Sequence, residues 1–514
     1  MTDTAWSDDA IGGVALGEAP PQAPSPAGSG QARLGRNILS LASGQVITWT
    51  MTLLWMLVVP RALGPTGWGT VVSALSVSGV AGIILGLGTR NYVVRELVVN
   101  RGAAPTLVGT AIVLRILLAP VFAACVIGYA WLSHSGHEAR LVLYLLAAFT
   151  LLTLLAEPMQ AGFQAIERMQ YLAYSDIVSK SAQSVAGIAL VLLGFRTIGI
   201  ATSLVVIGAG VIVLDAFWLR RFVRFALRTS TRKLVHMANQ SLAYWAFGVF
   251  SMLYLWIDTI MLSLMTRAEV VGWYGAPTRL FQTLMFLPVL LSTAWLPRLV
   301  AAFEISVERL GTTARTPLEL VLVLSMPIAA GTAILAGPLI HILYGSAYGN
   351  AVPVMVVLGL CIPPMYVNIM LASVLIAQKR QVVWTWVMAG ATVVNPPLNL
   401  LLIPMTQHRY GNGAVGAAVS LLLTELVVVA AGFTIVGRNI FGRAEARRCV
   451  LCGVATAAMC GTFYAARPLN VGLALFLAAA AFVLTAARLK VATPAEVAFV
   501  TARLSRLHAR LRQA

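Results

Sequence analysis

The chain has 514 residues, of which 59% are hydrophobic and only 11% are charged, and its mean hydropathy is +0.85. A soluble globular protein carries about 25% charged residues, so this composition excludes an ordinary water-soluble domain and indicates a polytopic helical membrane protein. The net charge of +18 does not indicate nucleic-acid binding, because the basic residues lie in short loops between apolar runs.

In chain order, residues 1–32 come first; they are rich in proline, glycine, alanine and serine and show no signal peptide, so we expect a disordered cytoplasmic tail. The apolar runs that follow are each long enough to cross a bilayer and predict an all-α fold with about 14 transmembrane helices. They are residues 38–60, 67–88, 107–132, 141–163, 177–195, 198–219, 241–265, 275–297, 318–343, 353–377, 382–404, 414–436, 449–466 and 469–488. Residues 491–514 predict a basic amphipathic cytoplasmic tail on the anionic inner leaflet, or a solvated tail.

Lysine and arginine alternate between the two sides of these spans. With the amino terminus inside, 27 of the 36 basic residues lie in cytoplasmic segments, 6 lie in external loops, and Arg115, Lys180 and Arg279 lie within spans. An error of one span in the middle of the chain would destroy this alternation. The positive-inside rule therefore predicts an even number of spans with both termini in the cytoplasm.

Short motifs recur at similar offsets and predict an internal repeat. Gly67-Trp68-Gly69 is matched 205 residues later by Gly272-Trp273-Tyr274, and Gly199-Ile200-Ala201 is matched 217 residues later by Gly416-Ala417-Ala418. Two such offsets predict two pseudo-symmetric six-helix lobes that share one orientation and enclose the substrate between them. The predicted divisions are an N-lobe at 33–235, a C-lobe at 236–440 and two added spans at 441–490.

Charged residues within spans are candidate functional residues, because an isolated charge at the bilayer centre is costly. Asp258 and Arg279 lie on consecutive spans, which predicts either a pair in a cavity or a structural ion pair. Glu157 and Arg115 lie deeper in their spans. Snorkelling to an interface is the alternative for Arg115, Lys180, Asp215 and Glu425. The cysteine pair Cys449-x-x-Cys452 lacks a partner pair, so no metal site or other cofactor is expected.

Proline doublets interrupt two of the predicted spans. Pro363-Pro364 and Pro396-Pro397 each remove helical hydrogen bonds and kink the axis. In a bilayer the freed carbonyls must find other partners or cavity water. We interpret these doublets as hinges, with static kinks as the alternative.

Several stretches together resemble the multidrug/oligosaccharidyl-lipid/polysaccharide (MOP) exporter superfamily, and within it the Wzx-type polysaccharide flippases. They are Pro60 to Gly69, Asp258, Val271 to Ala276, Leu343 to Tyr348, Asn395-x-x-x-Asn399 with Pro404, and Val415 to Ala418. The resemblance implies a MATE-like fold and export of undecaprenyl-diphosphate-linked oligosaccharide across the bacterial plasma membrane by alternating access. Related lipid II flippases use basic residues of a central cavity on the second and eighth spans, where Arg90, Arg95 and Arg279 lie in comparable places.

This resemblance and the charges lead to one functional hypothesis. Guanidinium groups bind phosphate oxygens bidentately, so Arg279, Arg90, Arg95 and Arg115 are the predicted contacts of the substrate diphosphate. Asp258 and Glu157 would hold a coupling proton or sodium ion, or form ion pairs. The expected partners are the lipid-linked oligosaccharide, membrane lipids, an ion gradient, and the polymerase and glycosyltransferases of the same pathway.

Other functions remain as alternatives. A lipid II flippase would differ only in the sugar, and a drug or cation antiporter of the same superfamily should have a mainly acidic lumen. ATP-driven transport is disfavoured because none of the four lysines follows a glycine, as a phosphate-binding loop requires. A membrane glycosyltransferase or polymerase needs external acids, and only Glu138 and Glu269 are predicted outside.

Overall fold

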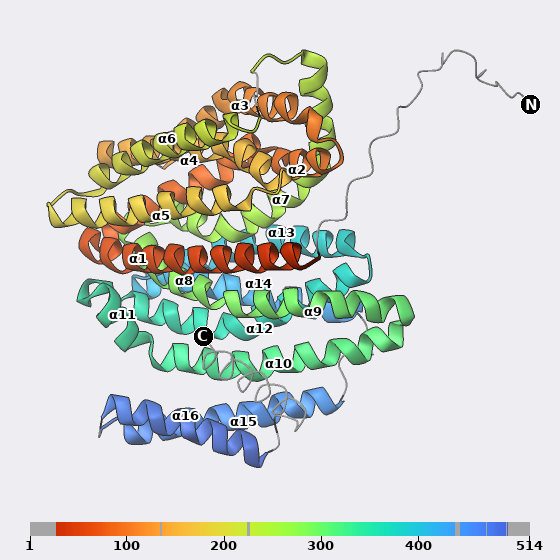
Figure 1. The fold of residues 1–514 in the computed structure, drawn as a ribbon. Coiled ribbons are helices and arrows are strands. Elements are labelled where there is room, and N and C mark those ends of the chain that lie inside the picture. Colours follow the sequence, from red (N-terminus) through yellow and green to blue (C-terminus); the bar gives the residue numbers. More distant parts are fainter. Residues whose placement is uncertain are drawn as a thin grey trace, which may run out of the picture.

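The computed structural model describes residues 27–133, 136–223, 227–436, 443–468, 470–489 and 491. These residues form helices, with no strand among them, and most of the long helices lie side by side (Figure 1). In chain order they are α1 Ala27–Gly86, α2 Thr89–Val99, η1 Arg101–Ala103, α3 Ala104–Leu132, α4 His137–Ala165, α5 Met169–Leu192, α6 Thr197–Arg220, α7 Thr231–Met265, α8 Ala268–Leu284, α9 Phe286–Ile305, α10 Val307–Ile334, α11 Ala336–Tyr344, η2 Ser346–Tyr348, α12 Ala351–Ala377, α13 Gln381–Tyr410, α14 Gly413–Val436, α15 Arg443–Ala466 and α16 Val471–Arg488. The predicted tails fall largely outside the described residues, although α1 already begins at Ala27.

Twelve helices of the described chain are long and apolar enough to cross a membrane, compared with the fourteen predicted. One difference arises because the first two predicted spans lie on α1, where Gly64 has φ 66° and joins two helical halves at a kink. A second arises because α5, which contains the predicted span 177–195, is not among the twelve. This helix carries Asp176 and Lys180, which reduce its mean hydropathy. The class of multipass helical membrane protein is confirmed.

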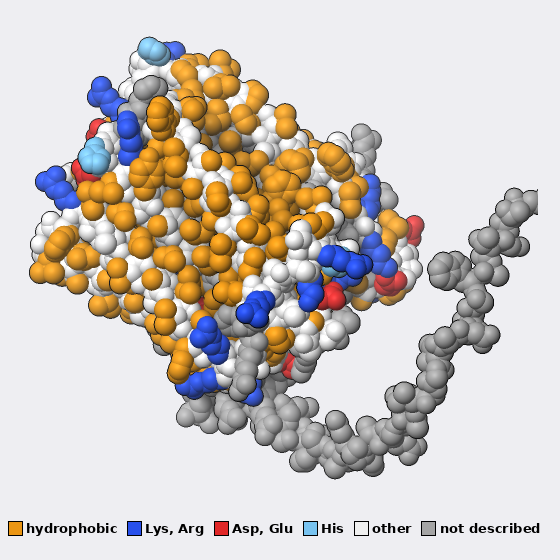
Figure 2. All heavy atoms as spheres, turned by 90° about the horizontal axis from the view of Figure 1, so that it is seen from above, with side chains coloured by type: hydrophobic (Ala, Val, Ile, Leu, Met, Phe, Trp, Pro, Cys, Tyr) orange, Lys and Arg blue, Asp and Glu red, His pale blue; other side chains and the backbone are white. Residues whose placement is uncertain are grey.

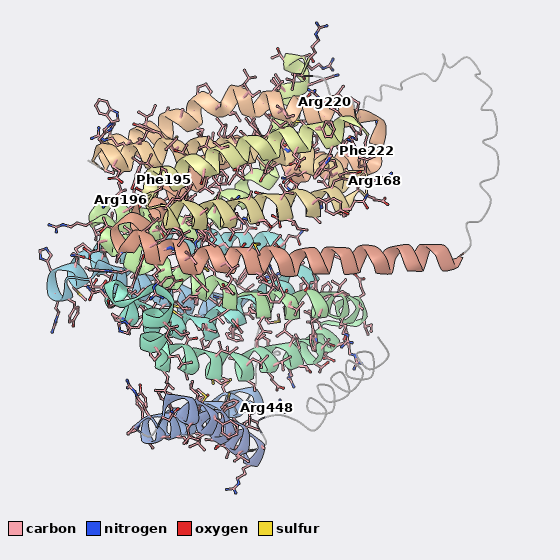
Figure 3. All side chains as sticks on the ribbon, turned by 60° about the vertical axis from the view of Figure 1, so that its left-hand side comes forward. Arg168, Phe195, Arg196, Arg220, Phe222 and Arg448 are labelled. Atoms are coloured by element: carbon pink, nitrogen blue, oxygen red, sulfur yellow. The ribbon has the colours of Figure 1, made fainter. Side chains whose placement is uncertain are left out.

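The surface suits a lipid environment. Hydrophobic side chains cover the broad middle of the face in Figure 2, and lysine and arginine gather near its edges. Figure 3 shows Arg168 and Arg220 at one end of the N-terminal helices and Arg196 at the other end. The charge alternation in the sequence predicts this separation, because Arg196 is the only one of the three expected outside.

Helix contacts arrange the chain in two groups and a hairpin. Helices α3 to α6 pack on α1, whereas α8 to α14 form the other group, with α12 near its centre. Helix α7 spans both groups, since it contacts α2 and α3 as well as α13 and α14. The hairpin α15–α16 packs on α10 (Figure 1), where Arg448 forms an ion pair with Glu319.

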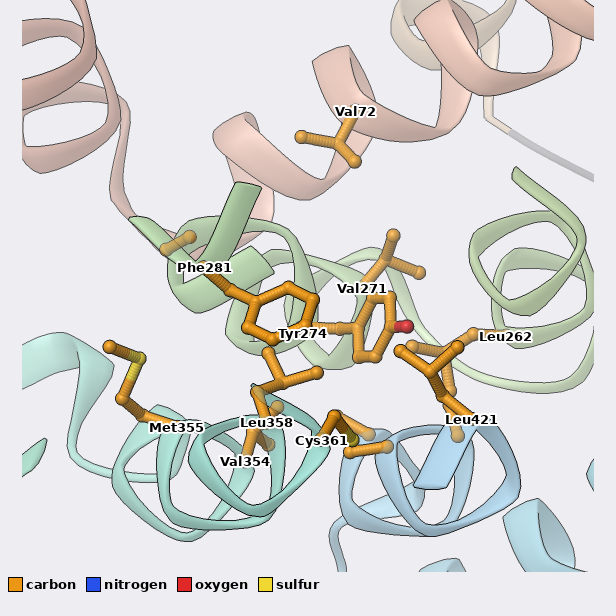
Figure 4. Close-up of a cluster of buried hydrophobic side chains, with 14 of the residues drawn as sticks. Val72, Leu262, Val271, Tyr274, Phe281, Val354, Met355, Leu358, Cys361 and Leu421 are labelled. Carbon is orange, nitrogen blue, oxygen red and sulfur yellow. The ribbon is translucent and has the colours of Figure 1, made fainter. Parts of the chain in front are cut away.

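Tyr274 lies in the largest hydrophobic core of the described chain. Figure 4 shows its ring among side chains from α1, α7, α8, α12 and α14, including Val72, Leu262, Leu358 and Leu421. This core joins the second half of α1 to the C-terminal group of helices. The position of Tyr274 matters for function, because its hydroxyl points from the core to Asp258.

The two glycine–tryptophan motifs of the predicted repeat lie against each other. A Cβ atom added to Gly69 would lie 1.7 Å from the carbonyl oxygen of Ala268, and one added to Gly272 would lie 2.0 Å from that of Pro65. Neither position can hold a side chain without a backbone shift. The repeat therefore produces a backbone-to-backbone contact between α1 and α8, at the end of the bundle that the charge pattern places outside.

Carbonyl groups freed by proline are bonded by side chains of neighbouring helices at three places. A proline cannot donate to the carbonyl four residues before it, and in lipid that carbonyl needs another partner. The donors are the Arg115 guanidinium to Leu154 before Pro158, the Tyr366 hydroxyl to Leu284 before Pro288 (2.7 Å), and the Cys452 thiol to Val323 before Pro327 (3.7 Å). These kinks are therefore specified jointly by a proline on one helix and a donor on the next.

Candidate functional site

Asp258 of α7 is 3% exposed and accepts hydrogen bonds from three side chains. The amide nitrogens of Asn395 and Asn399 lie 2.9 and 2.6 Å from its Oδ1, and the Tyr274 hydroxyl lies 3.3 Å from its Oδ2. The two asparagines are four residues apart, so they share one face of α13. All three donors are neutral groups, which leaves the charge of an ionised Asp258 uncompensated.

A second carboxylate, Glu425 of α14, is 2% exposed and belongs to the same region. It accepts hydrogen bonds from the Tyr254 hydroxyl of α7 and the Asn368 amide of α12. Asn395 links Asp258 to the residue before Glu425, because its amide also lies 3.4 Å from the hydroxyl of Thr424. We call this set the acidic cluster; its members are Tyr254, Asp258, Tyr274, Asn368, Asn395, Asn399, Thr424 and Glu425.

The acidic cluster contains oxygen acceptors but no base. Among the described residues, no lysine or arginine forms an ion pair with Asp258 or Glu425. The amide oxygens of Asn368 and Asn399 are buried and accept no hydrogen bond from the described part of the chain. An unpaired buried carboxylate costs several kcal/mol, and hard cations prefer oxygen ligands. The cluster can therefore be neutralised by protons or by a small cation.

Arg279 does not pair with Asp258, which corrects the expectation drawn from their consecutive spans. Its guanidinium lies 5.4 Å from the centre of the Trp256 ring and donates to Gln282 at 3.4 Å. Tyr274 of the same helix faces Asp258, and five further residues rotate the helix by about 140° from that direction. Arg279 is half-buried, and no carboxylate of the described chain pairs with it.

Arg115 and Glu157 form an ion pair between α3 and α4, with 2.9 Å between Nη2 and Oε2. Arg115 is 0% exposed and also donates to Thr89 (3.1 Å) and to the freed carbonyl of Leu154. The side chain of Glu157 is 29% exposed. Arg115 therefore holds three helices together, and we propose that it positions Glu157 instead of contacting a substrate directly.

Replacing Arg115 by methionine should destabilise the protein by about 3–5 kcal/mol, because breaking a buried pair leaves one charge uncompensated. It would also leave the carbonyl of Leu154 without its donor. Thermal unfolding of the purified protein checks this. The double variant Arg115→Met/Glu157→Gln should recover part of the loss, and equal stability of the single variant and the parent would contradict the role.

The predicted hinges flank the acidic cluster. Pro363-Pro364 in α12 ends four residues before Asn368, and Pro396-Pro397 in α13 lies between Asn395 and Asn399. Each doublet is thus within one turn of an asparagine that bonds a buried carboxylate. Their role as hinges stays a prediction. Because of their position, bending of α12 or α13 at these prolines would move the asparagines that bond Asp258 and Glu425.

The two other residues predicted to contact the substrate diphosphate, Arg90 and Arg95, lie on α2. Arg90 and Arg95 are exposed there, and Arg90 follows Thr89, the residue that Arg115 bonds. The structure does not bring them to Arg279, because α2 packs on α3, α4 and α7.

Sequence reasoning missed part of the acidic cluster. The sequence allows Glu425 and Asp215 to snorkel to an interface, whereas the structure buries both, and Asp215 accepts a hydrogen bond from Gln160 at 3.1 Å. The charge pattern and the motifs of the sequence point to neither Tyr254 nor Asn368. The spacing Asn395-x-x-x-Asn399 was the available signal, since two amides on one face of an apolar helix need a polar partner.

Comparison with known families identifies the chain. The family described as "Polysaccharide biosynthesis protein" matches residues 34–303, more than half of the sequence. The chain belongs to this family. The MatE family matches residues 246–401, which contain most of the acidic cluster. The membership of this chain in the MOP superfamily, predicted from the short stretches, is confirmed.

Solved structures of low sequence identity share the fold of this chain. "Lipid II flippase MurJ, inward closed conformation" has a TM-score of 0.69 at 11% identity, covering 87% of this chain and 97% of that one. An inward-facing MATE family multidrug transporter of the MOP superfamily has 0.60 at 13% identity, covering 80% and 95%. The eukaryotic MATE transporter AtDTX14 has 0.50 at 12% identity, covering 81% and 98%. No curated protein matches the sequence.

Proposed function

We propose that the protein is a flippase that moves undecaprenyl-diphosphate-linked oligosaccharide across the bacterial plasma membrane by alternating access, driven by a proton or sodium gradient. The family and the flippase-like fold support transport of a lipid-linked glycan. The observation that carries ion coupling is the acidic cluster, in which the described donors to the buried Asp258 and Glu425 are all neutral groups.

The energetic argument for coupling follows from this burial. A population shift from 1:99 to 99:1 needs about 5.5 kcal/mol, and an uncompensated buried charge costs several kcal/mol. Loss of a proton or cation from the acidic cluster would therefore be sufficient to change the preferred conformation. The proline doublets beside Asn368 and Asn395 would be the places where α12 and α13 bend in response.

The substrate contact proposed for the diphosphate is Arg279. It lies within the span Ala268–Ile305, and its planar guanidinium can bind two phosphate oxygens. Arg90 and Arg95 are proposed to attract the diphosphate at the cytoplasmic side before it reaches Arg279. Both termini are proposed to be cytoplasmic, as the positive-inside pattern requires.

Two rival functions differ in substrate. A lipid II flippase is favoured by the fold of MurJ, and a drug antiporter by the MatE match over residues 246–401. Transport assays in proteoliposomes distinguish the three functions. The purified protein is given lipid-linked oligosaccharide, lipid II or a cationic dye, and the transfer of each substrate is measured. We expect gradient-dependent transfer of the lipid-linked oligosaccharide, whereas transfer of the dye alone would overturn the proposal.

Replacing Asp258 by asparagine should remove gradient stimulation and reduce driven transport at least tenfold. The amide keeps the size of the side chain but can neither take up a proton nor compensate a cation. Transport by reconstituted protein with and without an imposed proton or sodium gradient measures the effect. The control is Asp176→Asn, an exposed carboxylate of α5, which should leave stimulation unchanged; persistent stimulation in Asp258→Asn would contradict the coupling role.

A further inference from the structure

A cavity of about 650 Å³ lies where the beginning of α7 crosses α2 and α3. Pockets for small organic ligands have volumes of about 300–1,000 Å³, so this one could hold a phosphorylated sugar. It is separate from the acidic cluster and from Arg279. Its lining residues are Tyr92, Glu96, Ala103, Thr106, Leu107, Thr110, Ser230, Arg232, Lys233, Val235, His236, Met237 and Asn239.

The walls of this cavity are fixed by hydrogen bonds. The hydroxyls of Thr110 and Thr229 lie 2.8 Å apart and connect α3 to the residues before α7. Ser230 caps α7, because its side chain accepts from the backbone nitrogen of Lys233 at 3.4 Å. Met237 and Tyr92 are buried residues of the lining. These contacts fix the beginning of α7 relative to α3, and therefore fix the shape of the cavity between them.

The two sides of the cavity differ in charge. The α7 side carries Arg232, Lys233 and His236, all exposed, next to the positive end of the helix dipole. The opposite side carries the Glu96 carboxylate and the Tyr92 hydroxyl, and burial together with Glu96 raises the pKa of Tyr92. A phosphate fits the basic side. A carboxylate repels phosphate but accepts hydrogen bonds from sugar hydroxyls.

We infer that this cavity is a loading site for the glycosyl phosphate part of the carrier-linked substrate on the cytoplasmic side. This inference rests on the proposed function. Phosphate would bind between Arg232 and Lys233, and the sugar would bond Glu96 and the hydroxyls of Thr106 and Thr110. Inorganic phosphate has no sugar hydroxyl that could donate to Glu96. An anionic lipid headgroup without a sugar would likewise make no use of Glu96, Thr106 and Thr110.

Helix α7 connects the loading site to the acidic cluster. From His236 to Tyr254 the helix advances 18 residues, or about 27 Å at 1.5 Å per residue. The same helix then presents Asp258 to α13. A substrate held at the beginning of α7 would therefore contact the element that also carries the coupling carboxylate.

The test uses the full-length protein in nanodiscs of zwitterionic lipid and isothermal titration calorimetry. The probes are glucose 1-phosphate and inorganic phosphate, and a parallel sample contains phosphatidylglycerol nanodiscs. We expect glucose 1-phosphate to bind more tightly than phosphate. Arg232→Gln/Lys233→Gln should weaken both probes at least tenfold, and Glu96→Gln should remove the preference for the sugar phosphate. Arg309→Gln, a basic residue at the start of α10 outside the cavity, should change neither.

Three results would overturn the inference. Equal affinity for both probes with no effect of Glu96→Gln would indicate a simple anion site. Loss of glucose 1-phosphate binding in phosphatidylglycerol nanodiscs would indicate a lipid headgroup site. Binding that survives Arg232→Gln/Lys233→Gln in the folded variant would place the probe elsewhere.

Transport kinetics separate this inference from the proposed function. In proteoliposomes, Arg232→Gln/Lys233→Gln should raise the KM for lipid-linked oligosaccharide at unchanged kcat, as loss of a loading site requires. Failure of the wild-type protein to transport the oligosaccharide would defeat the proposed function, whatever the calorimetry shows. Normal KM in the double variant, with wild-type transport intact, would defeat the loading site alone.

Discussion

Replacing Arg279 by alanine should abolish transfer of lipid-linked oligosaccharide at normal protein levels. The guanidinium lies within a membrane-spanning helix, and its contacts in the described chain are the Trp256 ring and the Gln282 amide. Because no carboxylate among the described residues pairs with Arg279, its charge is available to an anionic group. Each charge-assisted hydrogen bond contributes about 1.5–3 kcal/mol, so loss of a bidentate contact should lower transport at least a hundredfold.

The measurement is restoration of surface polysaccharide in cells that lack the native gene, together with transfer in proteoliposomes. Arg298→Ala is the matched control, because that guanidinium also lies beside a tryptophan, 5.7 Å from the Trp295 ring, but near the end of the span. Arg279→Lys should retain part of the activity, since it keeps the charge but loses the bidentate geometry. Unchanged export in Arg279→Ala would remove this residue from the substrate path.

The helices themselves were largely predictable from the sequence, because hydropathy reports directly on burial in lipid. The predicted span 141–163 lies within His137–Ala165, and 414–436 nearly coincides with Gly413–Val436. Where the prediction differed, a local feature outweighed composition. A positive φ at Gly64 joins two spans into the kinked α1, and charges in α5 lower its hydropathy below that of its neighbours.

The site was less predictable, because its contacts join residues far apart in the chain. Asn395 lies 137 residues from Asp258, and Tyr254 lies 171 residues from Glu425. Periodicity gives the face of one helix but not its rotation against another. The sequence therefore pairs Arg279 with Asp258 of the preceding span, whereas the structure places Arg279 beside Trp256. The hydrogen bond from Arg115 to the Leu154 carbonyl was equally hidden, since that carbonyl is freed by Pro158 on another helix.

Introducing a side chain at Gly272 should prevent closure of the contact between α1 and α8 and thereby stop transport. A Cβ atom there would lie 2.0 Å from the carbonyl oxygen of Pro65, and rigid backbone atoms cannot give way as a flexible side chain does. Overpacking costs about 1–3 kcal/mol, which changes the population of a closed state by about 5- to 150-fold. Gly272→Val should therefore hold the two helices apart at the end that we propose to be external.

Because the repeat places Gly69 in the reciprocal position, Gly69→Val should have the same effect, its Cβ meeting the Ala268 carbonyl at 1.7 Å. Gly210→Val is the control, since a Cβ at that glycine of α6 meets no atom within 4 Å. Labelling of a cysteine introduced at Ser263 by a membrane-impermeant reagent reports opening from outside. Both glycine variants should increase the labelling rate and lose transport at normal membrane levels. Unaltered labelling and transport in either one would show that the outer ends of α1 and α8 need not touch during the cycle.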